Sequence, residues 1–174
     1  MKSPFTGGEA RLCEEPRELM YRNMIYPYTY RFYVCQDTGM KFTDTALDTE
    51  NMEQVHKQYR KRFGIPSPQE IVDTRKRYGL SAAKMSEILG LGANQYRLYE
   101  AGEMPSQAIG KMLRSIETPT VFLGYIENAK QQMAPKEYDK ISDKVKQSFV
   151  NLLKKIDSIP DIQSVLFSPQ VTLE

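Results

Sequence analysis

The sequence predicts an α+β fold, with a small N-terminal β unit followed by an all-α region that ends in an extra amphipathic helix. Residues 26–35 alternate between two sets of side chains, which is the pattern of a half-buried strand. Residues 71–112 consist of short apolar segments separated by glycines, which is typical of short helices in succession. Residues 135–156 repeat apolar side chains at steps of three and four residues, as an amphipathic helix does.

The β unit is expected within residues 1–46. Aromatic and β-branched side chains, which favour strands, alternate along residues 26–35. We expect residues 19–25 to form the antiparallel partner strand, with the turn near Tyr26 and Pro27. A unit of this size has little core of its own, so it needs a staple or a packing partner.

A helix is expected over residues 48–63, with Thr49 as its N-cap. Gly64 ends this helix, because glycine readily adopts the left-handed conformation that helix ends favour. Two prolines then stiffen a linker over residues 64–68.

Residues 68–116 have the pattern of a helix-turn-helix. The first helix is expected over residues 68–78, and Ser81 is placed to cap the second. Tyr96 and Tyr99 lie three residues apart in the third helix, and we interpret them as core side chains and not as base-stacking groups. Each of these three helices ends at a glycine, and the glycines are Gly79, Gly90 and Gly102.

A helix of this kind fits the major groove of DNA, where its N-terminal turns reach base edges. Asn94 is expected in the first turn of the third helix, and its amide matches the N6 and N7 atoms of adenine. Leu98, four residues later, can contact a thymine methyl group, and Ser81 can bind a phosphate. The expected DNA-contacting residues are Ser81, Lys84, Gly92, Ala93, Asn94, Gln95, Arg97 and Leu98.

These side chains also have ordinary structural interpretations. Asn94 can be a solvated surface residue, and Arg97 can pair with a glutamate. Ser81 can be a helix cap and nothing more.

The net charge of +2 is too small to indicate a nucleic-acid partner by itself, but the positive charges are clustered. Only Glu70 and Asp73 lie between two groups of basic residues. A basic patch beside a DNA-reading unit would neutralise phosphates, although a solvated helix face is an equally good interpretation. The expected phosphate-contacting residues are Lys57, Arg60, Lys61, Arg62, Arg75 and Lys76.

Composition argues against several classes of protein. No apolar run is long enough to span a membrane, and the N-terminus has no apolar segment typical of a signal peptide. The two cysteines, Cys13 and Cys35, make no disulfide framework, so we expect a cytoplasmic protein. His56 is the one histidine, and no phosphate-binding loop or nucleophile motif is present, so we expect neither an enzyme nor a cofactor.

The segment SEILGLGANQYRLYEAGEMPS, residues 86–106, resembles the MqsA-type antitoxins, in which a YgiT-type zinc ribbon precedes an Xre-like helix-turn-helix domain of the lambda-repressor-like fold. The linker GIPSPQEI is also similar to the family, and the resemblance covers roughly residues 1–116. It implies an N-terminal domain that binds a toxin. It also implies a C-terminal domain that forms a homodimer and reads a palindrome in double-stranded DNA.

The chain departs from the family at the metal site and in the reading helix. The four zinc-ligand positions of the family carry hydroxyls and a single thiol, and hydroxyls are poor zinc ligands. We therefore predict a degenerate, zinc-ribbon-like fold without metal. Leu98 replaces the family's arginine, so the family's target sequence should not carry over. The degenerate ligand positions are Ser3, Thr6, Cys35 and Thr38.

We expect a dimeric transcriptional repressor that acts as the antitoxin of a type II toxin–antitoxin pair, with a cognate toxin as a second partner. The alternatives are a stand-alone Xre-type regulator without a toxin, and a protein-interaction module that has lost DNA binding. The expected parts are a β domain (1–46), a helix and linker (47–67), a helix-turn-helix domain (68–133), and a C-terminal helix with a tail (134–174).

The last helix is expected to run from Pro135 to about residue 156, before Pro160 stops it. Its apolar side must be buried, by packing on the helix over residues 119–133, in a dimer interface or in a toxin groove. The chain after Pro160 is expected to be extended or disordered.

Overall fold

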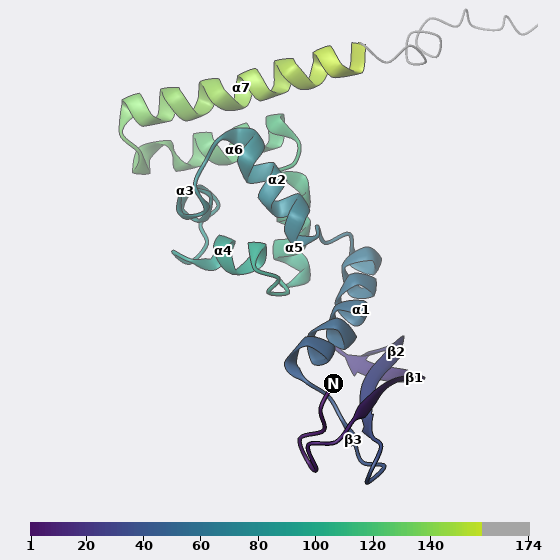
Figure 1. Ribbon diagram of the computed structural model, residues 1–174. Coiled ribbons are helices and arrows are strands. Elements are labelled where there is room, and N and C mark those ends of the chain that lie inside the picture. The colour runs from purple at the N-terminus through teal and green to yellow at the C-terminus, as the bar shows by residue number, and fades with distance from the viewer. Residues whose placement is uncertain (158–174) are drawn as a thin grey trace, which may run out of the picture. The chain divides into compact units, whose positions relative to one another are not determined.

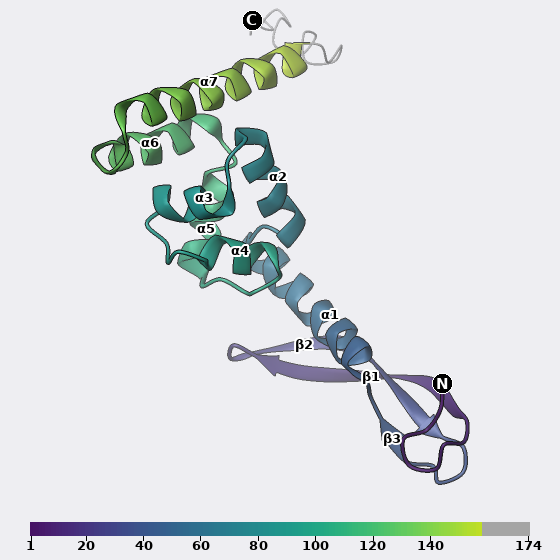
Figure 2. The ribbon, with the colours of Figure 1, turned by 60° about the vertical axis from the view of Figure 1, so that its left-hand side comes forward.

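The computed structural model describes residues 1–157 and is α+β, with a three-stranded antiparallel sheet followed by helices, as the sequence predicts (Figures 1 and 2). It divides into two compact units, Met1–Ile65 and the chain from Pro66 onward. The sequence predicts that the helix over residues 48–63 forms a part of its own with the linker, but in the structure this helix belongs to the first unit. The last long helix is also predicted as a separate part, and it belongs to the second unit. The expectation for the chain after Pro160 lies outside the described residues. Among the described helices, none is long and apolar enough to cross a membrane.

The first unit is built on a long hairpin of β1 (Ala10–Tyr21) and β2 (Met24–Cys35), with the short β3 (Lys41–Phe42) on the other side of β2. The turn is Arg22–Asn23, and both residues have positive φ angles, 48° and 64°, as the tight turn of a hairpin requires. The predicted partner strand, 19–25, and the predicted turn near Tyr26 and Pro27 are therefore wrong.

Helix α1 (Thr45–Phe63) supplies the hydrogen-bond partners for the part of β2 that β3 does not reach. Side-chain amides of α1 bond to the backbone of β2, at N···O distances between 2.7 and 3.0 Å. An amide carries both a donor and an acceptor, so it pairs with a strand edge as a peptide group does. The pairs are Asn51 with Arg31, Gln54 with Thr29, and Gln58 with Pro27.

The ends of α1 are set by local signals. Asp44 is the N-cap, and its carboxylate accepts from the backbone N–H of Leu47 at 2.8 Å. The predicted cap, Thr49, lies within the helix, where its hydroxyl donates to the carbonyl of Thr45. Gly64 ends the helix with φ 63°, as predicted.

The second unit contains six α-helices and a short 3₁₀ turn within its described residues. The predicted first helix, 68–78, is confirmed. The core of the second unit includes a stacked pair of rings, Tyr78 and Phe122, whose centroids are 4.6 Å apart. The elements are α2 (Pro68–Tyr78), α3 (Ala82–Ile88), α4 (Gln95–Glu100), α5 (Gln107–Ser115), α6 (Pro119–Ala129), η1 (Lys130–Gln132) and α7 (Pro135–Asp157).

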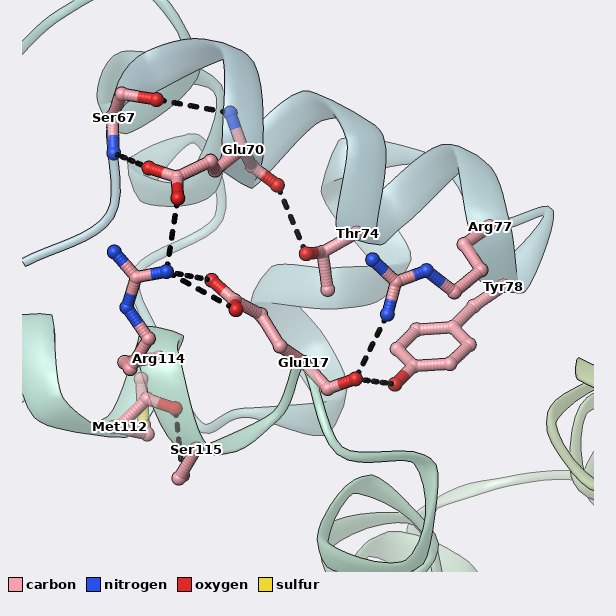
Figure 3. Close-up of polar contacts among 9 residues, drawn as sticks. All are labelled: Ser67, Glu70, Thr74, Arg77, Tyr78, Met112, Arg114, Ser115 and Glu117. Carbon is pink, nitrogen blue, oxygen red and sulfur yellow. Dashed lines mark hydrogen bonds and ion pairs between the residues drawn. The ribbon is translucent and has the colours of Figure 1, made fainter. Parts of the chain in front are cut away.

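A polar network fastens α2 to the junction of α5 and α6 (Figure 3). The guanidinium of Arg114 pairs with Glu70 at 2.9 Å and with Glu117 at 3.0 Å. Partial burial acts to raise the pKa of Glu70. Hydrogen bonds from the backbone N–H of Ser67, from Arg114 and from the Ser67 hydroxyl outweigh burial and lower this pKa to about 2.

Helix α7 runs along α6 (Figures 1 and 2). Ile141 and Val145 are buried, and both belong to the core of the second unit. Of the three alternatives for this helix, packing on α6 is the one that the structure contains. The C-terminal half of α7 leaves Val150, Leu152 and Leu153 exposed.

Candidate nucleic-acid interface

Helices α3 and α4 are joined by a short turn that their own side chains stabilise. Ser81 caps α3 as predicted, because its hydroxyl accepts from the backbone N–H of Lys84 at 3.1 Å. Gly90 has φ 65° and follows the end of α3. Ser86 is buried, and its hydroxyl accepts from the backbone N–H of Tyr96 at 3.1 Å. This bond fixes the first turn of α4 against α3.

Two tyrosines and an ion pair hold α4 on the body of the second unit. Tyr96 and Tyr99 are buried, as predicted. The hydroxyl of Tyr96 donates to the carbonyl of Ile71 at 3.0 Å, and burial raises its pKa, so it stays a neutral donor. Two guanidinium nitrogens of Arg75 donate to the Glu100 carboxylate, at N···O distances of 2.5 and 3.3 Å. The helix is therefore held rigidly from its inner side.

The outer side of α4 is exposed and carries the central residues of the predicted interface. Asn94 is the N-cap of α4, one residue before its first turn, and its amide makes no capping bond. Arg97 is exposed, and no hydrogen bond or ion pair of its side chain is found in the described chain. Leu98 is 43% exposed. Ala93, in the turn that precedes α4, is also exposed.

Other predicted contact residues are engaged within the protein. Gln95 donates its amide to Glu103 at 2.8 Å. The ammonium of Lys84 lies between two carboxylates, 2.7 Å from Glu87 and 2.8 Å from Glu137. Gly92 and Ser81 are exposed, but the Ser81 hydroxyl is used as a helix cap.

The six predicted phosphate-contacting residues fall into the two different units. In the first unit, Arg60 is buried, while the other three basic side chains of α1 are exposed. In the second unit, Arg75 is engaged with Glu100, and Lys76 is exposed at the end of α2. The exposed members of the set are Lys57, Lys61, Arg62 and Lys76.

The four degenerate ligand positions come together at one point in the first unit. They lie in two similar turns, 3–7 and 35–39, each closed by a backbone bond onto a glycine with φ near 70°. Cys35 is fully buried, and the hydroxyl of Thr6 lies 3.6 Å from its sulfur. Ser3 and Thr38 also hydrogen-bond to this sulfur.

Hydrogen bonds from Ser3 and Thr38 lower the pKa of the Cys35 thiol to about 6, against the opposing effect of burial. Thr38 contributes both its hydroxyl and its backbone N–H, and Thr6 adds a smaller effect. One thiolate and three hydroxyls do not suit zinc, which takes cysteine, histidine or carboxylate ligands. A hydrogen-bonded hydroxyl–thiol cluster therefore joins the two turns.

Sequence reasoning missed the acidic side chains that engage the predicted contacts. Glu137 on α7 reaches Lys84, and Glu100 on α4 reaches Arg75. Neither pairing has a sequence signal, because both bring together residues far apart in the chain. Glu103, which accepts from Gln95, follows a glycine and a helix end, where a loop residue is expected to be solvated.

Comparison with known proteins gives no assignment, since no family model and no curated protein matches the chain.

Proposed function

We propose that the chain is a sequence-specific DNA-binding repressor in which α3 and α4 form a helix-turn-helix and α4 enters the major groove. The observation that carries the proposal is the outer side of α4. Asn94, Arg97 and Leu98 are exposed there on a helix whose inner side is held by buried groups. A rigid helix with unused hydrogen-bonding and apolar groups at its N-terminal turn suits base-edge readout.

Each of the three side chains has a role in this proposal. The amide of Asn94 pairs with adenine, since it offers a donor and an acceptor side by side. Leu98 contacts the methyl group of a thymine. Arg97 binds a phosphate or a guanine. Lys57, Lys61 and Arg62 of α1 and Lys76 of α2 add phosphate contacts.

The proposed repressor is a homodimer, because two copies of α4 read two half-sites of a palindrome about one helical turn apart. The chain is further proposed to be the antitoxin of a type II toxin–antitoxin pair. This part rests on the resemblance of residues 86–106 to the MqsA-type antitoxins. The paired turns around Cys35 also support it, since they suit a ribbon-like domain that has lost its zinc.

The test of DNA binding starts from the wild-type chain and a randomised pool of duplex DNA, from which bound sequences are selected. Asn94→Ala should then lose about 1–3 kcal/mol of discrimination between the selected site and random DNA. Asn128→Ala, an exposed asparagine on α6, is the matched control and should change nothing. If Asn94→Ala binds both DNAs as the wild type does, Asn94 does not read bases.

The toxin is tested separately. Expression of the neighbouring gene alone should arrest growth, and co-expression with this chain should restore it. A neighbour without effect on growth leaves a stand-alone regulator as the function.

A protein-interaction module is the second candidate function. The observation that favours it is the engagement of Gln95 and Lys84 within the protein, next to the exposed apolar Leu98. An interaction module would show no salt-dependent DNA binding, whereas a repressor loses affinity steeply as salt rises.

A further inference from the structure

A hollow of about 490 Å³ lies between the C-terminal end of α2 and the C-terminal half of α7, within the second unit. Its α2 side consists of residues 76–79. Its α7 side consists of residues 144, 147, 148, 151 and 152, whose spacing places them on one face of the helix. The proposed DNA-binding function makes no use of this hollow apart from Lys76.

Two small residues, Gly79 and Ser148, line the hollow. Gly79 ends α2 with φ 63°, and a Cβ atom at this position would lie 3.4 Å from the ammonium of Lys144. Lys144 lies beside this glycine and donates to its carbonyl at 3.2 Å. On the opposite wall, Ser148 is buried at a position where a packed helix usually carries a larger apolar side chain.

The lining carries three cations and no carboxylate. They are Lys76, Arg77 and Lys144. Arg77 donates to the backbone carbonyl of Glu117 at 2.9 Å, and Lys144 donates to that of Gly79, so both partners are neutral. No ion pair of these three residues is found in the described chain. Like charges in a shared hollow repel one another, and a bound anion relieves that repulsion.

The neutral part of the lining limits what the anion is attached to. Leu152, which is 39% exposed, offers apolar surface beside the cations. Gln147 donates to Asn151 at 3.1 Å, which leaves the amide nitrogen of Asn151 for a further partner. A volume of this size belongs to the range of small-molecule sites and far exceeds that of a single phosphate ion.

We propose that this hollow binds a phosphorylated small molecule of about nucleotide size. The phosphoryl group lies among Lys76, Arg77 and Lys144, because guanidinium and ammonium groups are the usual phosphate-binding side chains. The organic part lies against Leu152 and the amide of Asn151. The proposal does not depend on the DNA-binding function.

The experiment is calorimetric titration of the full chain with inorganic phosphate, AMP, ATP and citrate at physiological salt. ATP or AMP should bind saturably, one per chain, and more tightly than inorganic phosphate or citrate. Lys144→Met should weaken this binding about tenfold or more, since it removes a charged hydrogen-bond donor. Lys140→Met, which removes an exposed lysine of α7 outside the hollow, is the matched control and should bind as the wild type does.

A second variant, Ser148→Leu, fills the hollow without changing the net charge and should abolish binding. Circular dichroism checks that each variant is folded. The proposal is overturned if neither nucleotide binds saturably, if citrate binds as tightly as ATP, or if Lys140→Met weakens binding as much as Lys144→Met does. Loss of duplex DNA binding by Lys144→Met, without nucleotide binding by the wild type, would assign the hollow to the DNA backbone instead.

Discussion

The two units are stabilised by different kinds of contact. The second unit has a continuous apolar core that reaches from Ile71 on α2 to Val145 on α7. The first unit has a smaller buried set, and its hairpin depends on polar contacts at two places. These places are the amide pairs between α1 and β2 and the hydroxyl–thiol cluster around Cys35.

The difference follows from the shape of each unit. A long hairpin exposes two strand edges and both faces, so one helix can cover only part of it. Its backbone groups must then be satisfied by side chains, and Asn51 and Gln54 do so. Helices satisfy their own backbone groups, so the second unit can devote its inner side chains to apolar packing.

Loss of apolar packing should therefore have the largest effect in the second unit. Phe122 is fully buried and stacks on Tyr78. Phe122→Ala should lower the free energy of unfolding of this unit by about 3–5 kcal/mol, because it removes a large buried side chain and leaves a cavity. Hydrogen exchange read separately for the two units measures the effect.

The control for this prediction is Val121→Ala, at the neighbouring and exposed position. It should change the stability by less than about 0.5 kcal/mol. The prediction is wrong if Phe122→Ala and Val121→Ala lower the unfolding free energy equally. It is also wrong if Phe122→Ala lowers hydrogen-exchange protection equally in both units.

Loss of a polar contact should have the next largest effect, in the first unit. Asn51 is buried, and its amide makes two bonds to the backbone of Arg31. Asn51→Ala leaves that N–H and that carbonyl without partners, which costs about 1–3 kcal/mol. Faster hydrogen exchange of the β2 amides would report it, while Glu53→Ala on the exposed side of α1 should leave exchange unchanged.

The sequence predicts the second unit better than the first, because helix ends are local signals. Ser81 capping α3 and Gly79 ending α2 each act within a few residues, so both were predictable. The hairpin turn at Arg22–Asn23 was missed, because arginine followed by asparagine lacks the glycine that usually marks such a turn.

In the candidate interface too, the sequence predicts some features and misses others. The exposure of Asn94 and Arg97 and the burial of Tyr96 follow helical periodicity, and the sequence carries that signal. The engagement of Lys84 by Glu137 depends on how α7 packs, and single-sequence patterns do not contain it. The meeting of Ser3 with Cys35 was expected only through the resemblance to a zinc-binding family.

The hydroxyl–thiol cluster makes the first unit sensitive to pH. The pKa of Cys35 is lowered from about 9 to about 6, so its contribution to stability is fully present above pH 9 and is lost as pH falls through 6. In a Cys13→Ser background, thiolate absorbance should titrate near pH 6, and Ser3→Ala should raise that midpoint. A midpoint unchanged by Ser3→Ala would show that Ser3 does not stabilise the thiolate.

The smallest effect is expected at Glu70, where the second unit has its own charged contact. The pKa of Glu70 is lowered from 4.5 to about 2, so its contribution is present above pH 4.5 and is lost as pH falls toward 2. About half of this side chain is exposed, so screening by water keeps the contribution below about 1 kcal/mol.

Urea unfolding of the wild type and Glu70→Gln between pH 7 and pH 2 tests this expectation. The difference in unfolding free energy should be present at pH 7 and should shrink as pH falls below 4.5 toward 2, because the Glu70 carboxylate is then increasingly protonated and becomes neutral like glutamine. Asn128→Ala, an exposed change on α6 that involves no titratable group, is the control and should have the same effect on stability at every pH. A Glu70→Gln difference that stays constant with pH would mean that the shape of the side chain, and not its charge, stabilises the contact with Arg114.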